Sequence, residues 1–216
     1  MVKNQILKIN EIFYSLQGES SRIGLPTTFI RLTGCPMRCN YCDTAYAFHE
    51  GKNLSFDEII DEIKHFDTNF ITVTGGEPLA QRSCYAFLDQ LCDIGYDVSL
   101  ETGGALSIKD VHEKVKIILD IKTPGSGESE NNHWDNLLLI KPTDEIKIVI
   151  TDQNDYKWAK KVIQEKGLYL NSDILFSPSF GDLEPSELAG WILKDNLKVR
   201  MQLQLHKIIW GEKKGV

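Results

Sequence analysis

The chain has 216 residues, 42% of them hydrophobic, and its 24 lysines and arginines stand against 31 aspartates and glutamates. A formal net charge of -7 argues against a broad nucleic-acid or anionic-membrane surface, although a local basic pocket remains compatible with it. No apolar run approaches the ~20 residues that span a bilayer, and no apolar signal core follows the N-terminus. We therefore expect a cytoplasmic protein with a single domain over residues 1–216.

Short apolar runs rich in β-branched residues recur along the chain and predict buried strands. They lie at residues 28–32, 70–74, 98–102, 117–121, 146–150 and 174–176, with a last, more polar strand at 202–207. Amphipathic stretches predict helices at 55–66, 79–94, 108–115, 133–140, 156–165 and 186–194. The first helix begins with a capping box, Ser55 and Glu58, and the second ends at Gly95, which suits a C-cap.

Alternating strands and helices imply parallel strands joined by crossovers. Six such units are too few for a closed eight-stranded barrel, so we expect an α/β fold, an open or partial βα barrel of about six parallel strands. Ligands of such folds bind at the C-terminal ends of the strands. Residues suited to chemistry follow four of the strands and are expected on one face, at 34–35, 75–78, 101–104 and 122–125.

Three of the five cysteines, Cys35, Cys39 and Cys42, form a C-x3-C-x2-C group directly after the first predicted strand. Structural zinc sites and simple ferredoxin clusters take four ligands, so a group of three indicates a metal centre with an open position. The residues allow an Fe–S cluster with a non-protein ligand on its fourth iron. They also allow zinc with a fourth ligand from His49 or from farther along the chain.

The remaining cysteines and histidines do not extend this group. Cys84 and Cys92 lie about 12 Å apart along one predicted helix, too far for a disulfide, and we expect them to be core thiols. Four of the five histidines stand in polar contexts typical of surface residues: His49, His65, His112 and His133.

The cysteine group has an aromatic residue, Tyr41, before its last cysteine, and it resembles the signature of radical S-adenosylmethionine (SAM) enzymes. In those enzymes three thiolates hold a [4Fe–4S] cluster and the amino-acid end of SAM binds its fourth iron. Gly75-Gly76-Glu77, after the second predicted strand, resembles the glycine motif that holds the SAM amino group. Glycines at such a turn also expose backbone groups to a ligand without interference from a Cβ.

Three further segments narrow the resemblance. Leu16-Gln17-Gly18-Glu19 forms a polar turn, Arg31 precedes the cysteines, and Cys42-Asp43-Thr44 follows them. With the cysteine motif they resemble the 7-carboxy-7-deazaguanine synthase family over nearly the whole chain. The resemblance implies a radical SAM fold with reduced helices and a bound Mg2+. It also implies conversion of 6-carboxy-5,6,7,8-tetrahydropterin to 7-carboxy-7-deazaguanine with loss of ammonia, SAM being used catalytically.

The resemblance implies roles for individual residues. The cluster loop, residues 34–44, would bind the [4Fe–4S] cluster through Cys35, Cys39 and Cys42 and Mg2+ through Thr44. SAM would contact Tyr41, Cys42, Asp43, Gly76, Glu77, Thr102, Asp120, Ile121 and Lys122. The pterin would contact Leu16, Gln17, Gly18 and Glu19 in the turn of residues 11–20, Arg31, Thr74, and His206 and Val216 in the tail of residues 199–216. The guanidinium of Arg31 suits a carboxylate, and Gln17 suits the amide-like edge of the ring.

Two rival interpretations stay open. One is another small radical SAM enzyme, such as an activase that makes a glycyl radical on a partner protein; the other is a non-catalytic zinc or Fe–S carrier domain. An activase needs a docking surface and no pterin pocket, so Gln17, Arg31 and Thr44 argue against it. The family further suggests a homodimer that is reduced by a flavodoxin or ferredoxin, with no nucleic-acid or membrane partner.

Overall fold

The computed structural model describes residues 5–170 and 172–216, and its strands form one nine-stranded sheet in the order β3-β1-β2-β4-β5-β6-β7-β8-β9. The strands are β1 Ile6–Leu16, β2 Pro26–Leu32, β3 Lys52–Ser55, β4 Phe70–Gly75, β5 Asp97–Thr102, β6 Lys116–Asp120, β7 Glu145–Ile150, β8 Asp173–Pro178 and β9 Arg200–Met201. The α-helices are α1 Phe56–Ile63, α2 Ser83–Ile94, α3 Gln153–Lys166, α4 Pro185–Lys194 and α5 Leu205–Trp210. Within these residues no helix is long and apolar enough to cross a bilayer.

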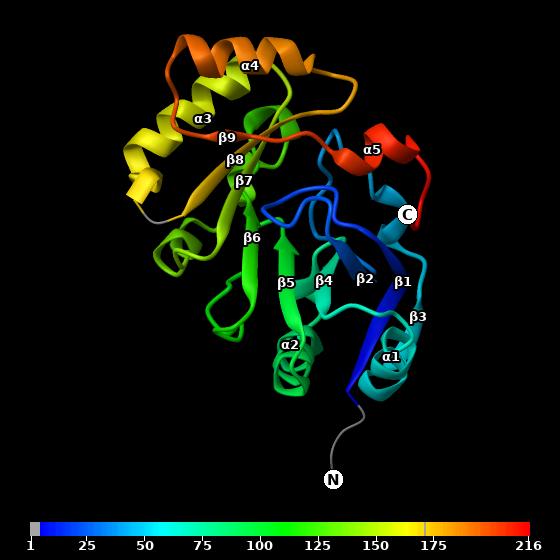
Figure 1. The fold of residues 1–216 in the computed structure, drawn as a ribbon. Coiled ribbons are helices and arrows are strands. Elements are labelled where there is room, and N and C mark those ends of the chain that lie inside the picture. The colour runs from blue at the N-terminus through cyan, green and yellow to red at the C-terminus, as the bar shows by residue number, and fades with distance from the viewer. Residues whose placement is uncertain (1–4, 171) are drawn as a thin grey trace.

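The strands from β2 onward are parallel, and β1 runs antiparallel to both β2 and β3. All six predicted parallel strands are present, so the open βα sheet is confirmed; the edge strands β3 and β9 are the two ends of its order. Figure 1 shows the sheet curving, with α1 and α2 beside its β1 to β5 half and α3 and α4 beside β7 to β9.

The two faces of the sheet differ because successive side chains of a strand point to opposite sides. The face that packs in the core with the helices is apolar and includes Ile71, Val73, Leu100, Ile117 and Ile148. The inner face alternates with these positions and carries Thr72, Thr74, Glu101, Asp120 and Lys147. A parallel sheet is usually apolar on both faces, so this polar inner face indicates a site rather than a core.

The helix ends follow the sequence signals. Ser55 and Glu58 form the predicted capping box at the start of α1, and Gly95 ends α2 in the left-handed conformation at φ 105°. Asp152 caps α3 through the N–H groups of Asn154 and Asp155.

Two predicted helices are absent from the connections that flank β6. Residues 108–115 form a turn-rich loop, and the segment 133–140 contains only a short 3-10 helix, Trp134–Leu138. The buried side chain of Asn136 connects the two segments: it donates to the carbonyls of Gly104 and Leu106 and accepts from the N–H of Ile108. These bonds satisfy the loop backbone without a helix. The reduced helix content is thereby confirmed.

The last predicted strand is also wrong, because most of residues 202–207 leave the sheet after the two-residue β9. Their polar groups bond instead to the segment of residues 17–25 that joins β1 to β2, which we name the floor loop. Gln202 accepts from the N–H of Ser20, and the N–H of Leu205 donates to the carbonyl of Gly18.

The floor loop lies at the N-terminal edge of the parallel strands, since β1 is antiparallel to β2. Arg22 pairs there with Asp97 at the start of β5, and the N–H of Ser21 donates to Glu145 at the start of β7. The loop therefore closes the end of the sheet opposite the cluster loop.

Candidate active site

A cavity of about 550 Å³ lies on the inner face of the sheet, a size typical of small-molecule sites. Its wall combines the cluster loop, the floor loop, the ends of β4, β5 and β6, and the C-terminal tail. It brings together every site residue predicted from the sequence except Glu77 and Ile121, which do not line it. The roles of the lining residues remain predictions.

The cluster loop presents Cys35, Cys39 and Cys42 as half-buried free thiols. Within residues 5–170 and 172–216, no three His, Cys, Asp or Glu side chains are close enough to hold a single metal ion. A four-iron cluster takes each thiolate on a different iron, so its ligands stand farther apart than those of one zinc ion. The cluster loop supplies three such thiolates from one short segment.

Burial also governs the protonation of these thiols. It raises the pKa of all three, and that of Cys39 to about 11. The thiols therefore keep their protons at neutral pH in the absence of iron, and cluster binding must displace them.

The glycine turn after β4 lies directly on the cluster loop. Gly75 has φ 144°, and a Cβ there would collide with the backbone of Leu32. A Cβ on Gly76 would collide with the carbonyl of Gly34 and come within 2.9 Å of the Cβ of Cys35. The glycine turn and the start of the cluster loop approach each other so closely that both positions require glycine. The predicted SAM motif therefore packs against Cys35.

Glu77 is fully buried and its carboxylate points to the neighbouring loop rather than to the cavity. It accepts from the hydroxyl of Thr102, from the N–H of Gly103 at 2.8 Å and from the N–H of Leu79 at 3.1 Å. Burial raises the pKa of this carboxyl, although these donors oppose the shift. Glu77 thus joins the loops after β4 and β5, and its partners Thr102 and Gly103 line the cavity.

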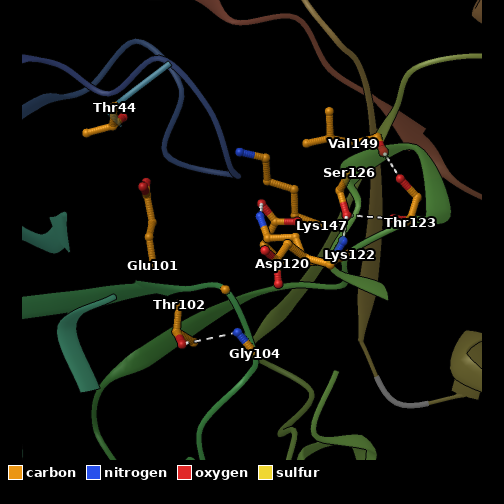
Figure 2. A network of polar contacts seen from close by, with 12 residues as sticks. Thr44, Glu101, Thr102, Gly104, Asp120, Lys122, Thr123, Ser126, Lys147 and Val149 are labelled. Atoms are coloured by element: carbon orange, nitrogen blue, oxygen red, sulfur yellow. Dashed lines mark hydrogen bonds and ion pairs between the residues drawn. The ribbon is translucent and has the colours of Figure 1, made fainter. Parts of the chain in front are cut away.

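The end of β6 supplies charged groups to the cavity. The Nζ of Lys122 is 3.0 Å from Asp120 Oδ2 and 5.8 Å from the centre of the Tyr41 ring. In the part of the chain described, Asp120 Oδ1 and the Tyr41 hydroxyl are buried without a hydrogen-bond partner. Figure 2 shows Asp120 and Lys122 close together, whereas Ile121 belongs to the core. Two unpaired polar atoms in a cavity fit a polar ligand such as SAM.

The floor loop contributes Gln17, whose amide nitrogen donates to Thr72 at 3.2 Å and to Glu101 at 3.3 Å. Thr74 donates to the other oxygen of Glu101 at 3.0 Å. Burial raises the pKa of Glu101. These residues form a polar floor under the cavity.

Arg31 faces the cavity from β2 with its charge partly balanced. Its Nε donates to Glu11 at 2.7 Å, and its guanidinium lies over the rings of Phe13 and Tyr46. Glu11 binds one edge of the fork, so the planar group keeps donors for a second carboxylate.

The C-terminal tail closes the remaining side. His206 packs so tightly on Gly18 that any Cβ there would collide with its ring. Burial lowers the pKa of His206 although Glu19 and Asp43 oppose the shift. Val216 also lines the cavity.

Next to the tail, in the cluster loop, Thr44 donates to Asp43 at 2.8 Å, and Asp43 lies 3.7 Å from the Nζ of Lys207. The bond leaves the hydroxyl oxygen of Thr44 available as the predicted Mg2+ ligand.

Comparison with known proteins identifies the family. The model of the Radical SAM superfamily matches residues 29–124. The chain is 49% identical to a 7-carboxy-7-deazaguanine synthase of Chlorobaculum tepidum over 95% of this chain and 94% of that protein. It is 41% identical to another of Koribacter versatilis over 97% of this chain and 100% of that protein. The chain belongs to the 7-carboxy-7-deazaguanine synthase family.

The fold of this family member agrees with solved structures. QueE from Escherichia coli superposes with a TM-score of 0.77 at 21% identity, covering 94% of this chain and 97% of that one. Streptococcus suis SuiB bound to S-adenosylmethionine gives a TM-score of 0.51 at 13% identity, covering 79% of this chain and 45% of that one. The chain is a radical SAM enzyme, a class that uses a [4Fe–4S] cluster and SAM.

Several cavity residues of this radical SAM enzyme were missed by sequence reasoning. Lys147 lies in the middle of β7 and forms an ion pair with Glu19. The end of β8 adds Ser177 and Pro178, and the loop after it adds Ser179 and Phe180. A lysine between Ile146 and Ile148 was the available signal, since a charge inside an otherwise buried strand needs a partner.

Proposed function

We propose that this chain converts 6-carboxy-5,6,7,8-tetrahydropterin into 7-carboxy-7-deazaguanine with loss of ammonia, using SAM catalytically. The supporting observation is that Gln17 and Arg31 face the same polar cavity as the three cysteines of the cluster loop. When bound, a [4Fe–4S] cluster held by Cys35, Cys39 and Cys42, together with SAM, would supply one-electron radical chemistry at the pterin.

The chain's own residues recognise the pterin. The terminal nitrogens of Arg31 bind the pterin carboxylate, with Glu11 fixing the orientation of the fork. Leu16, Gln17, Gly18 and Glu19 meet the ring edge, and Thr74, His206 and Val216 complete the pocket. Holding the ring against the floor places one C–H towards the cluster loop and excludes water from the reacting atoms.

A second group of residues holds SAM. The cavity-lining members are Tyr41, Cys42, Asp43, Gly76, Thr102, Asp120 and Lys122. Asp120 and Tyr41 offer the unpaired polar atoms, and Glu77 acts by fixing Thr102. Ile121 acts by fixing the segment between Asp120 and Lys122, since its side chain is in the core and its N–H donates to the carbonyl of Lys147.

Three further elements complete the proposal. Thr44 binds Mg2+ at the wall of the cavity, where few protein ligands are needed. The active form is a cytoplasmic homodimer, and a flavodoxin or ferredoxin reduces the cluster. The chain forms one radical SAM domain over residues 1–216, with the substrate turn at 11–20, the cluster loop at 34–44 and the tail at 199–216.

An anaerobic reaction tests the proposal. Cluster-reconstituted protein is incubated with dithionite, SAM, Mg2+ and 6-carboxytetrahydropterin, and the products are resolved by mass. We expect 7-carboxy-7-deazaguanine to accumulate while most SAM survives. Cleavage of SAM to 5′-deoxyadenosine without that product would refute the substrate and leave another radical SAM reaction, such as glycyl-radical formation on a partner protein.

A further inference from the structure

Asp155 is a buried carboxylate that lies outside the cavity and that the proposed chemistry does not use. It stands in the first turn of α3 and accepts hydrogen bonds from two segments. In the segment before the helix, the hydroxyl and the N–H of Thr151 donate to Asp155 at 2.6 and 3.2 Å. From the loop after β6 it takes the Thr123 hydroxyl and the Gly125 N–H, both at 2.8 Å.

The bonds to Thr123 and Gly125 are not needed to cap the helix. Asp152 already caps α3, accepting from the N–H groups of Asn154 and Asp155 at 2.8 Å. The second pair of bonds therefore serves the loop of residues 123–127.

That loop in turn holds the cluster loop. The side-chain amide of Asn40 donates to the carbonyl of Gly125 at 3.1 Å, and the N–H of Asn40 donates to the carbonyl of Ser126 at 2.9 Å. Asn40 lies between Cys39 and Cys42 in the sequence. Its contacts therefore fix the backbone that carries two of the three thiols.

The contacts leave little room for movement. A Cβ on Gly125 would collide with the side chains of both Thr151 and Asp155. The Thr123–Ser126 turn is further held by a bond from the Ser126 hydroxyl to the Thr123 carbonyl at 2.6 Å, and Thr123 also donates to Val149 (Figure 2). The path from α3 to the cluster loop is thus a packed series of short polar contacts.

We infer that Asp155 is a positioning residue for the iron–sulfur cluster: it fixes residues 123–126, and these fix Asn40 and the thiols of Cys39 and Cys42. The inference rests on the proposed function only in that the cysteines hold the cluster. Groups that orient metal ligands change affinity by about 10–100-fold when they are removed. Asp155 acts in this way from a helix on the outer side of the sheet.

The test compares Asp155→Asn with Asp152→Ala in the full-length, cluster-reconstituted protein. Both changes alter the first turn of α3, but only Asp155 contacts the loop that holds Asn40. Three properties are measured without pterin: the rate of iron loss to a chelator, the EPR spectrum of the reduced cluster, and its reduction potential. We expect Asp155→Asn to lose iron about tenfold faster, with a changed EPR spectrum and potential. Asp152→Ala lowers the melting temperature and leaves the cluster unchanged.

An Asp155→Asn protein that folds with an unchanged spectrum and iron-loss rate overturns the inference, and so does an Asp152→Ala protein with the same cluster defect. If Asp155→Asn fails to fold, Asn40→Ala serves as the second variant, because Asn40 is exposed and the change removes only its side-chain bond to the Gly125 carbonyl. It is expected to reproduce the faster iron loss, and a normal cluster in this variant contradicts the path. A wild-type chain with a normal cluster but no deazaguanine product refutes the proposed function and leaves this inference standing.

Discussion

The guanidinium of Arg31 lies between Glu11 and the cavity. Its paired N–H donors lead to a specific prediction. Arg31→Lys keeps the charge but removes the paired donors, so we expect the KM for the carboxypterin to rise about tenfold through loss of one charge-assisted hydrogen bond. The affinity for SAM should stay unchanged, because Arg31 lies on the pterin side. Steady-state kinetics and SAM titration measure both, with the exposed Arg82→Lys as a matched control. An equal loss of SAM affinity contradicts the assignment.

The lowered pKa of His206 leads to a prediction for the pH dependence of folding stability. Its pKa is lowered in the folded protein by burial, whereas the unfolded histidine titrates near 6.5. The unfolded state therefore takes up this proton first, so stability is lost as pH falls from about 6.5 through the folded pKa. Glu19 and Asp43 limit the shift, and Lys207 and Lys147 add to it.

The measurement is the free energy of unfolding of the cluster-free chain, obtained by denaturant titration at a series of pH values from about 7.5 to about 5. We expect His206→Asn to lose less stability over this interval than the wild type. His65→Asn, at an exposed position in the segment after α1, should behave as the wild type. Identical pH slopes for the wild type and His206→Asn would falsify the prediction.

Sequence reasoning found most cavity residues where the motif is local, as in the cluster loop and the glycine turn. It missed Lys147 because its partner, Glu19, is distant in sequence and meets it only when the floor loop crosses the sheet. It placed Glu77 in the SAM contact, whereas the carboxylate bonds to Thr102 and Gly103. The direction of a side chain at a turn depends on the neighbouring loop, which the motif does not contain.

The floor loop is an element whose position depends on residues outside the cavity. Arg22 is buried, lies over the ring of Phe70 at 5.2 Å and bonds to both the carbonyl and the carboxylate of Asp97. Arg22→Gln removes this anchor, and we expect the KM for the pterin to rise several-fold because Gln17 is then less well held. Binding of SAM, measured by titration, should not change. Arg200→Gln, at an exposed position in β9, is the control; a parallel loss of SAM binding in Arg22→Gln would indicate general unfolding instead.

The capping box of α1 gives an energetic prediction at the same scale. Ser55 accepts from the N–H of Glu58, and the Glu58 carboxylate accepts from the N–H of Ser55. Ser55→Ala should lower the free energy of unfolding by about 1 kcal/mol. Denaturant titration measures the loss, and Ser55→Thr, which can still cap, should retain most of the stability. A Ser55→Ala protein as stable as the wild type contradicts the role of the cap.

Elements were predictable where periodicity and end signals agreed, as in the six parallel strands, α1 and α2. The helices expected at 108–115 and 133–140 are absent, and the buried side chain of Asn136, in the second segment, bonds instead to Leu106 and Ile108 at the start of the first. The segment 202–207 failed for a related reason: its polar groups bond to the floor loop, which no local pattern reveals. β1 went unpredicted because the polar residues Asn10 and Glu11 interrupt its apolar alternation.

At the scale of the whole molecule, the cluster is expected to stabilise the fold, because a group that binds only the native state shifts the unfolding equilibrium. Removal of iron from the reconstituted protein should lower the Tm by about 5 °C or more. Cys39→Ala should show the lower Tm from the start and bind no complete cluster.

The matched control is Cys84→Ala, which removes a buried thiol from the core cluster of α2. This change should lower the Tm through a small packing defect and leave the iron content at the wild-type value. Calorimetry and iron analysis of the same samples separate the two effects. Iron loss in Cys84→Ala, or full iron in Cys39→Ala, would show that the assignment of the thiols is wrong.

An open sheet has two free edges, at either of which another chain could add a strand and start aggregation. Here the outermost strands offer little template: β3 has 4 residues and β9 has 2. The part of β1 that extends past β3 begins at the irregularity between Ile9 and Glu11, and such bulges bend a strand and increase its twist. An incomplete barrel can thus keep its inner face open to ligands while resisting edge-to-edge polymerisation.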